Sequence, residues 1–150
     1  MIAWRGTAWR LIDAAAVDRA TRPVPSPEGR FHHDGQPAIY TSLTPEGCGI
    51  AIRAYLRADA LSRMLVPLTI AAERLVDLRG AGLAPSIVWQ DIRASGAPSP
   101  TWALSDMARA RGAQGLLYRS RSRRDLVHLV LFDPAAIRDA GPAQAWSASA

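Results

Sequence analysis

The chain has 150 residues, 49% of them hydrophobic, which is enough to bury the core of one ordinary domain and excludes disorder over most of its length. All eighteen basic residues are arginine, and the net charge of +5 favours an acidic partner, such as a nucleotide, a nucleic acid or an acidic protein. The single cysteine, Cys48, excludes an internal disulfide and a cysteine-based metal cluster.

The amino-terminal sequence indicates neither secretion nor membrane insertion. Arg5 and Arg10, each preceded by a tryptophan, interrupt the first apolar run, which therefore lacks the continuous apolar segment of a signal peptide. No later apolar run approaches the length of a membrane span. We therefore expect a cytoplasmic protein in a bacterial type of cell.

The amino-terminal half predicts two strands, a helical turn and one helix. The helix has a clear start, because Thr44 is a good N-cap, Pro45 suits the first turn and Glu46 complements the positive end of the helix dipole. A proline-rich loop precedes the second strand. The expected ranges are a strand over 1–4 that delivers Arg5 to its end, a helical turn over 13–22, a strand over 38–42 and a helix over 45–58.

The carboxy-terminal half predicts a second helix and several apolar strands. Thr101 is expected to cap this helix and Gly112 to end it. A β-rich segment over 65–78 is interrupted by Ala72 and Glu73, so it predicts either two paired strands or one bent strand. The other ranges are an irregular segment over 79–100, a helix over 102–111, strands over 115–119 and 126–132, a basic turn over 120–125 and a frayed tail over 141–150.

These elements define a fold class. Strands and helices do not alternate regularly along the chain, which argues against a doubly wound parallel sheet. About six strands and two firm helices, with strands at both ends of the chain, fit an α+β fold better. We expect one compact domain over residues 1–140, built on a central, largely antiparallel sheet with flanking helices.

The stretch over residues 29–42 is the strongest candidate for a ligand site. Its first part has the composition of an exposed turn, and its second part that of a strand that ends in hydroxyl groups. Arg30 offers a planar fork of donors for phosphate or carboxylate, and Tyr40 offers a flat ring with a polar tip. The alternative is a polar hairpin loop that leads into a core strand.

Three other groups of residues resemble known functional motifs but do not match them. Gly80 and Gly82 follow a strand, but Pro85 occupies the position of the third glycine of a dinucleotide-binding loop. His32 and His33 are neighbours in the sequence, and such side chains do not easily converge on one metal ion, so we expect no metal site. Serines and histidines are present without the nucleophile elbow of a hydrolase.

The segment over residues 119–124 (Arg-Ser-Arg-Ser-Arg-Arg) has the composition of a nucleic-acid-binding turn. Such a run is more often a solvated face or a protein contact, and most of the aromatic residues that could stack on bases fall on apolar faces. We therefore expect a protein contact at this turn and no direct contact with nucleic acid.

Several segments follow one another in a recognisable order: Gly-Arg-Phe at 29–31, Ile-Tyr-Thr-Ser-Leu-Thr-Pro-Glu at 39–46, and further segments at 100–106, 112–120 and 129–132. This order resembles the RES-domain toxins of bacterial type II toxin–antitoxin pairs. The resemblance implies a split sheet similar to that of ADP-ribosyltransferases, and an enzyme that uses NAD⁺ as a substrate for hydrolysis, phosphorolysis or ADP-ribose transfer. It also implies a cognate Xre-like antitoxin with an acidic segment that covers the active site, and a host target protein.

The resemblance assigns roles by position. Arg30, Tyr40 and Ser120 are the expected catalytic residues. Arg5 matches the family's amino-terminal arginine, with Arg10 as the alternative. His32 and His128 occupy positions that hold asparagine in the family. The expected NAD⁺-binding residues are Arg5, Arg30, His32, Tyr40, Ser42, Ser120 and His128.

The chemistry of NAD⁺ cleavage suits these residue types. The bond between nicotinamide and ribose breaks with positive charge developing on the ribose, so the protein must hold the diphosphate, stack the nicotinamide and exclude water. Arg5 and Arg30 can bind the diphosphate, and Tyr40 can stack on the nicotinamide. Ser120 can bond the ribose or a phosphate. His128 alternates with apolar residues of its strand, so it is either a satisfied core histidine or a ligand contact.

One family residue is missing. The family has a glutamate eleven residues after the strand tyrosine, where this chain has Ala51, which we expect on the inward side of its helix. Glu46 lies five residues earlier and is expected to face elsewhere. Because the family glutamate stabilises the ribose cation, its absence favours a mono-ADP-ribosyltransferase whose target protein supplies part of the machinery, as in the ParT-like branch. The alternatives are an NAD⁺ glycohydrolase or phosphorylase, and a catalytically inactive binding protein.

Overall fold

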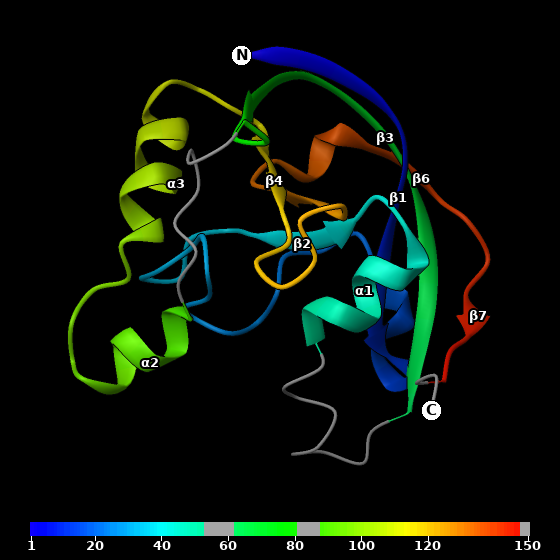
Figure 1. The fold of residues 1–150 in the computed structure, drawn as a ribbon. Helices are drawn as coiled ribbons and strands as arrows, with labels where there is room; N and C mark the ends of the chain where they lie inside the picture. Colours follow the sequence, from blue (N-terminus) through cyan, green and yellow to red (C-terminus); the bar gives the residue numbers. More distant parts are fainter. Residues whose placement is uncertain (53–61, 81–87, 148–150) are drawn as a thin grey trace.

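Two long antiparallel strands form the longest pairing of the fold. The computed structural model describes residues 1–52, 62–80 and 88–147. In it, β1 (Ile2–Asp13) pairs with β3 (Arg63–Asp77) from Ile2 opposite Leu75 to Asp13 opposite Arg63. Figure 1 shows the two strands curving side by side along one edge of the molecule. The strand expected over residues 1–4 is therefore much longer, because almost every residue of β1 finds a partner in β3.

Three shorter strands close the sheet on itself. β1 pairs with β2 (Ile39–Ser42), β2 with β5 (Val127–Leu131), β5 with β4 (Gly115–Arg119), and β4 with β3, which returns to β1. Only the pairing between β3 and β4 is parallel among the described strands. β6 (Ile137–Ala140) and β7 (Gln144–Ala145) also pair with β3.

This topology confirms a mixed domain with a largely antiparallel sheet. Of the two alternatives expected for residues 65–78, the structure shows a single strand, β3, of 15 residues. Because β3 is so long, one edge pairs with β1 while the other pairs in turn with β7, β6 and β4. The result is one sheet closed into a ring, in place of the split sheet that the family resemblance led us to expect.

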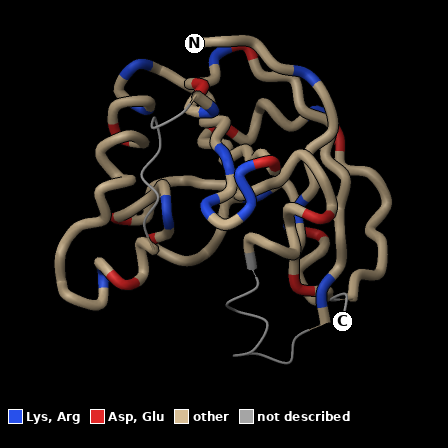
Figure 2. Tube along the Cα trace, viewed as in Figure 1, with Lys and Arg blue, Asp and Glu red and all other residues tan. Residues whose placement is uncertain are grey.

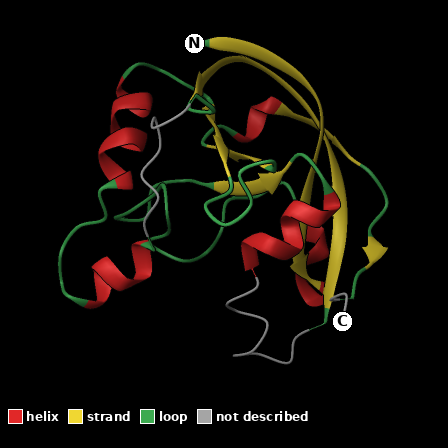
Figure 3. Cartoon of the chain, in the orientation of Figure 1, coloured by secondary structure: helices red, strands yellow, loops and turns green. Residues whose placement is uncertain are grey.

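Figure 3 shows two helices, α2 (Trp89–Ala94) and α3 (Thr101–Ala110), on one side of the molecule, and α1 (Pro45–Ile52) apart from them. The remainder of the predicted 45–58 helix lies outside the described residues. Short 3-10 turns cover Ala14–Arg19 and Pro134–Ala136. α2 lies in the segment expected to be irregular, and residues 141–147, expected to fray, contain β7. None of the described helices is long and apolar enough to cross a membrane.

The alternation of side chains along the strands produces two cores. Residues on one face, such as Ile39, Leu117 and Leu129, fill the interior of the closed sheet. Residues on the other face, such as Leu116 and Val130, pack outside it, together with Leu104 and Ala108 of α3. Helix α3 thus packs on the outer face of the sheet, and polar residues at even-numbered positions of β2, β5 and β4 share that face.

Arg10 is a structural residue of this fold. It is 6% exposed, and its Nη1 donates hydrogen bonds to the carbonyl oxygens of Ala20 at 2.7 Å and Arg22 at 2.6 Å. Burial lowers the pKa of the guanidinium to about 10, so it stays charged at neutral pH. Arg10 therefore holds the chain after β1 against that strand and is not placed to bind a ligand.

Replacing Arg10 tests this role. Arg10→Leu should lower the free energy of unfolding by about 2–4 kcal/mol, because buried carbonyl oxygens lose a charged donor. Arg5→Leu, on an exposed position of the same strand, is the matched control and should change it by less than about 0.5 kcal/mol. Urea titration of both variants measures the two values. Equal values for the two variants would contradict the structural role of Arg10.

Candidate functional site

Polar side chains from three strands meet on the outer face of the sheet. Ser42 of β2 is opposite His128 of β5, and His128 is in turn opposite Tyr118 of β4. Tyr40 lies two residues before Ser42 and Ser120 two residues after Tyr118, so alternation puts them on the same face. The cross-strand register therefore gathers residues that are far apart in the sequence into one cluster.

Ser42 and His128 form the buried centre of this cluster. The Ser42 Oγ and His128 Nδ1 atoms are 2.6 Å apart, and the two residues are 1% and 4% exposed. Burial, with a smaller contribution from the charge of Arg30, lowers the pKa of His128 to about 4. The imidazole is therefore neutral at neutral pH, and it brings hydrogen-bonding capacity without charge. The rings of His128 and Tyr118 lie 5.4 Å apart.

Arg30 adds a positive charge to the cluster. Its guanidinium carbon lies 5.2 Å from the ring centroid of Tyr118 and 5.3 Å from that of Phe31, within the range of cation–π interactions. Burial lowers the pKa of Arg30 and raises that of Tyr118 to about 12. Both groups keep their ordinary protonation states at neutral pH, so the cluster carries a net positive charge on a largely aromatic support.

The turn that carries Arg30 is fixed by the start of α3. The Thr101 hydroxyl donates to the carbonyl oxygen of Arg30, and Trp102 Nε1 donates to the carbonyl oxygen of Gly29 at 2.8 Å. Thr101 was expected to cap its helix, but it is the first helical residue and its hydroxyl serves the neighbouring turn. The helix therefore positions the Arg30 backbone directly.

The hydroxyl of Tyr40 ties the other side of the turn. It accepts from the backbone N–H of Phe31 at 2.9 Å and lies 2.8 Å from His32 Nδ1. His32 Nε2 is 3.0 Å from the carbonyl oxygen of Ser26, so Nε2 carries the proton and Nδ1 accepts from the Tyr40 hydroxyl. Burial lowers the pKa of His32, in agreement with a neutral ring.

These hydrogen bonds explain the roles of His32 and of the neighbouring Gly29. Both ring nitrogens of His32 are engaged and the residue is 1% exposed, so it supports the turn and has no nitrogen available for NAD⁺. A glycine is required beside it, because a Cβ at Gly29 would lie 2.5 Å from His32 Cε1 and 2.9 Å from the Tyr40 hydroxyl. Close packing thus accounts for the glycine of the Gly-Arg pair in the sequence motif.

His33 is directed away from His32. Its Nε2 lies 2.8 Å from Asp106 Oδ2 of α3, its Nδ1 lies 2.7 Å from Asp34 Oδ2, and its ring stacks on Trp102. The hydrogen bond to Asp106 is the main reason that the pKa of His33 is raised. Within the described residues, no group of three or more potential metal ligands occurs.

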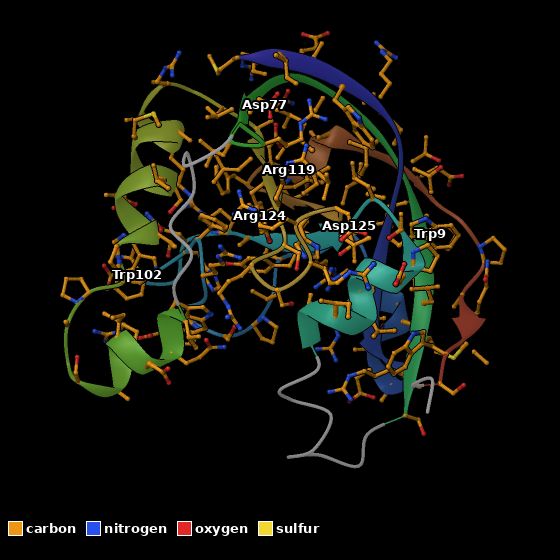
Figure 4. All side chains as sticks on the ribbon, viewed as in Figure 1. Trp9, Asp77, Trp102, Arg119, Arg124 and Asp125 are labelled. Atoms are coloured by element: carbon orange, nitrogen blue, oxygen red, sulfur yellow. The ribbon has the colours of Figure 1, made fainter. Side chains whose placement is uncertain are left out.

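The basic turn connects the end of β4 with β5. Figure 2 shows its positive residues gathered near the centre of the view, and Figure 4 places Arg119, Arg124 and Asp125 together there, apart from Trp102 of α3. Ser120 is 3% exposed at the base of this turn, and its hydroxyl accepts from the backbone N–H of Arg123 at 3.3 Å. Ser120 thus lies just after the end of β4, on the face that Tyr118 shares.

Arg5 does not join the cluster. The residue is exposed in the middle of β1, opposite Ala71 of β3, and no contact among the described residues connects it with Arg30. It was expected to stand at the end of a short strand, but β1 continues for eight residues beyond it, to Asp13.

The helix α1 flanks the cluster without supplying the family glutamate. Gly47 packs on Ser42, because a Cβ at Gly47 would lie 2.9 Å from that of Ser42. Ala51 follows one turn later on the same face of α1, but it is exposed to solvent and not packed inward as expected. Glu46 forms an ion pair with Arg123, whose Nη1 lies 3.0 Å from Glu46 Oε1, and so contacts the basic turn.

Sequence reasoning missed Tyr118 and the supporting role of Thr101 and Trp102. Leu116, Tyr118 and Ser120 alternate along one strand, so the pattern contained a signal that Tyr118 shares the face of Ser120. The hydrogen bonds from α3 to the Arg30 turn join residues more than seventy positions apart and left no local signal.

Comparison with known proteins places this fold in a family. The RES domain family matches residues 7–150. The chain belongs to the RES domain family. In the RES chain, the motif segments thus lie on the Arg30 turn, β2, α3, β4 and β5. No curated protein matches.

The fold is also similar to that of a solved protein. A chain in the crystal structure of the MbcT–MbcA toxin–antitoxin complex of M. tuberculosis superposes with a TM-score of 0.56 at 21% sequence identity, covering 97% of this RES domain and 84% of that chain. At this identity the likeness establishes a common fold for the two chains.

The buried His128 should make stability depend on pH. Its pKa is 6.5 in the unfolded chain and about 4 in the fold, so the unfolded state binds the proton more readily. The free energy of unfolding should fall by about 3 kcal/mol as the pH drops from 6.5 to below 4. His128→Asn keeps a polar side chain that does not titrate in this range. Its free energy of unfolding should therefore lack the decrease of about 3 kcal/mol that His128 causes at low pH.

The measurement is urea unfolding of both proteins between pH 4 and pH 8. The titrations of His32 and His33 contribute equally to both curves, so the difference between the curves isolates His128. Parallel curves would show that His128 is not buried in its neutral form.

Proposed function

We propose that this RES domain is the toxin of a toxin–antitoxin pair and that it uses NAD⁺ as its substrate. The observation that carries the proposal is the cluster of Arg30, Tyr118, His128, Ser42 and Ser120 on the outer face of the sheet. It combines a cation for phosphate, aromatic rings for a flat heterocycle and neutral hydrogen-bonding groups for ribose. Membership of the RES family and the fold shared with a chain of the MbcT–MbcA complex support the same reading.

In this proposal each group has one task. Arg30 binds the diphosphate, and the partly exposed face of the Tyr40 ring stacks on the nicotinamide. Ser120 and the Ser42–His128 pair hydrogen-bond the ribose or phosphate. The bond between nicotinamide nitrogen and ribose breaks, nicotinamide leaves with the electron pair, and a nucleophile attacks the ribose carbon and loses its proton. Aromatic and apolar neighbours keep water away from the developing cation.

ADP-ribose transfer to a host protein is the favoured reaction. Ala51 offers no carboxylate for the ribose cation, and Glu46 is held by Arg123. A target protein that supplies the acceptor side chain also supplies what the site lacks. The neutral His128 beside Ser42 supports a second candidate, NAD⁺ hydrolysis or phosphorolysis, because a neutral imidazole can accept a proton from water or phosphate.

The antitoxin of the pair is proposed to be an Xre-like protein with an acidic segment over the site. The charge of the turn after β4 supports this, since Arg121 and Arg124 are exposed there. Such charges act mainly on the rate of association and on its salt dependence. Arg123 contributes less to this proposed antitoxin contact than the sequence indicated, because its guanidinium is already paired with Asp125 and Glu46.

Replacing Arg30 tests the site. In Arg30→Ala, consumption of NAD⁺ should fall roughly tenfold to a hundredfold, because a charge-assisted bond to phosphate contributes about 1.5–3 kcal/mol. Arg30→Lys keeps the charge over the rings but loses the planar fork, so it should recover part of the activity. Arg111→Ala, at an exposed arginine that ends α3, is the control and should behave as wild type.

The assay has two arms, with circular dichroism to verify folding. NAD⁺ alone reports nicotinamide release, which identifies a hydrolase, and labelled NAD⁺ with cell lysate reports transfer to a protein band. Inorganic phosphate in the first arm separates phosphorolysis from hydrolysis. The absence of NAD⁺ consumption in both arms, by a folded wild-type protein, would refute the enzymatic proposal.

Installing the missing carboxylate is a separate test. Ala51 is exposed on the face of α1 that packs on Ser42, so Ala51→Glu has room for its side chain and should raise nicotinamide release without acceptor. One well-placed charged group contributes on the order of 10²–10³ in rate, which sets the upper limit of the gain. Ala51→Gln is the matched control without charge. A rate that stays at the wild-type level in a folded, NAD⁺-binding Ala51→Glu protein would mean that this face of α1 does not reach the ribose.

A further inference from the structure

We propose that Arg121, in the turn between β4 and β5, forms with Arg30 a two-guanidinium site for the diphosphate group of the substrate. The inference rests on the proposed use of NAD⁺ and deepens it by naming the second diphosphate ligand. It assigns to Arg121 the role that the family resemblance gave to Arg5, which lies on a different part of the sheet.

The arginines of this turn are not equivalent. Arg119 donates from Nε to the carbonyl oxygen of Arg79 at 2.9 Å and from Nη1 to that of Arg124 at 2.9 Å, so its side chain holds the turn closed. Arg123 forms ion pairs with Asp125 at 2.8 Å and with Glu46 at 3.0 Å. These two guanidiniums are therefore used within the protein, and their charges are solvated by its own oxygen atoms.

Arg121 and Arg124 are the other two arginines of the turn, and both are exposed. Among the residues that the structure describes, neither side chain makes a hydrogen bond or an ion pair. Two exposed guanidiniums in one short turn therefore provide a ligand candidate and a natural control that differs from it in position alone.

Position favours Arg121 over Arg124. Arg121 directly follows Ser120, whose hydroxyl belongs to the cluster, and Ser120 follows the strand in which Tyr118 lies under Arg30 at 5.2 Å. Burial is the main cause of the lowered pKa of Arg30, and the positive charge of Arg121 lowers it further. The two guanidinium groups therefore repel each other. Arg124, in contrast, lies three residues further along the turn, and its backbone carbonyl oxygen accepts from Arg119 Nη1.

The turn is held in place by contacts that do not involve Arg121. The Arg123 amide donates to Ser120 Oγ at 3.3 Å, and the Arg123 guanidinium anchors the turn to α1 through Glu46. Arg121 is therefore presented from a fixed backbone, which reduces the entropy lost when its side chain binds a ligand.

The chemistry of this pair selects a diphosphate. Two like charges close together repel each other, and an anion with two adjacent negative groups relieves that repulsion while accepting several charge-assisted hydrogen bonds. A single phosphate cannot engage both guanidiniums as fully. The site should therefore bind ADP more tightly than AMP, and inorganic pyrophosphate should compete with ADP.

The test is isothermal titration calorimetry of the full chain with ADP, AMP and pyrophosphate. Arg121→Ala should weaken ADP binding roughly tenfold to a hundredfold, as expected for the loss of one charge-assisted phosphate contact. Arg124→Ala removes the same charge from the same turn and should change ADP affinity less than about twofold. AMP binding should be weak in all three proteins.

Equal losses in Arg121→Ala and Arg124→Ala would overturn the proposal, because they would reveal a general effect of positive charge. Unchanged ADP affinity in Arg121→Ala, or wild-type protein that binds neither ADP nor pyrophosphate, would overturn it as well. A titration with NAD⁺ distinguishes failure of the diphosphate site from failure of the proposed function. Wild type that binds ADP through Arg121 but neither binds nor consumes NAD⁺ would refute the proposed function and leave the diphosphate site intact.

Discussion

The antiparallel register across β2, β5 and β4 is the constraint on which the candidate site depends. It sets Ser42 opposite His128 and His128 opposite Tyr118, so that one row of side chains crosses three strands. A shift of a single residue in either pairing would turn His128 toward the interior of the closed sheet and replace it by an apolar neighbour. The 2.6 Å contact between Ser42 and His128 is thus a product of backbone hydrogen bonding.

The register alone does not provide a charge, and α3 adds it. The bonds from Thr101 and Trp102 to the backbone of the Arg30 turn, with the Tyr40 hydroxyl on the opposite side, fix the turn from two directions. Arg109 adds a bond from Nη1 to the carbonyl oxygen of Phe31 at 2.9 Å. The firmly held backbone thus places the Arg30 guanidinium over the rings of Phe31 and Tyr118.

Charge at the site is controlled by how the arginines are distributed. The excess of positive charge in the chain is general, but Arg10, Arg119 and Arg123 have their guanidiniums satisfied by carbonyl or carboxylate oxygens. Neutral His128 and His32 add no further charge. The charges of Arg109 and Arg30 both act on Tyr40, so the positive charge at the cluster comes from a few of the arginines of the chain.

The sequence by itself predicted many of the local elements and several residues of the candidate site. Patterns within a few residues predict helix starts, the apolar strands and the motif residues Arg30, Tyr40 and Ser120. Alternation along a strand predicts which face of the sheet each side chain lies on. Ser42 and His128 were also among its candidates.

Only the tertiary structure decided the rest, because it depends on contacts between distant segments. The closure of the sheet requires both edges of β3, and the length of β1 comes from its partner. The structural use of His32 and Arg10 depends on carbonyl groups that the loops bring to them, and the separation of Arg5 from Arg30 depends on strand order. Such long-range contacts are set by the packing of the whole chain, so no short stretch of sequence contains them.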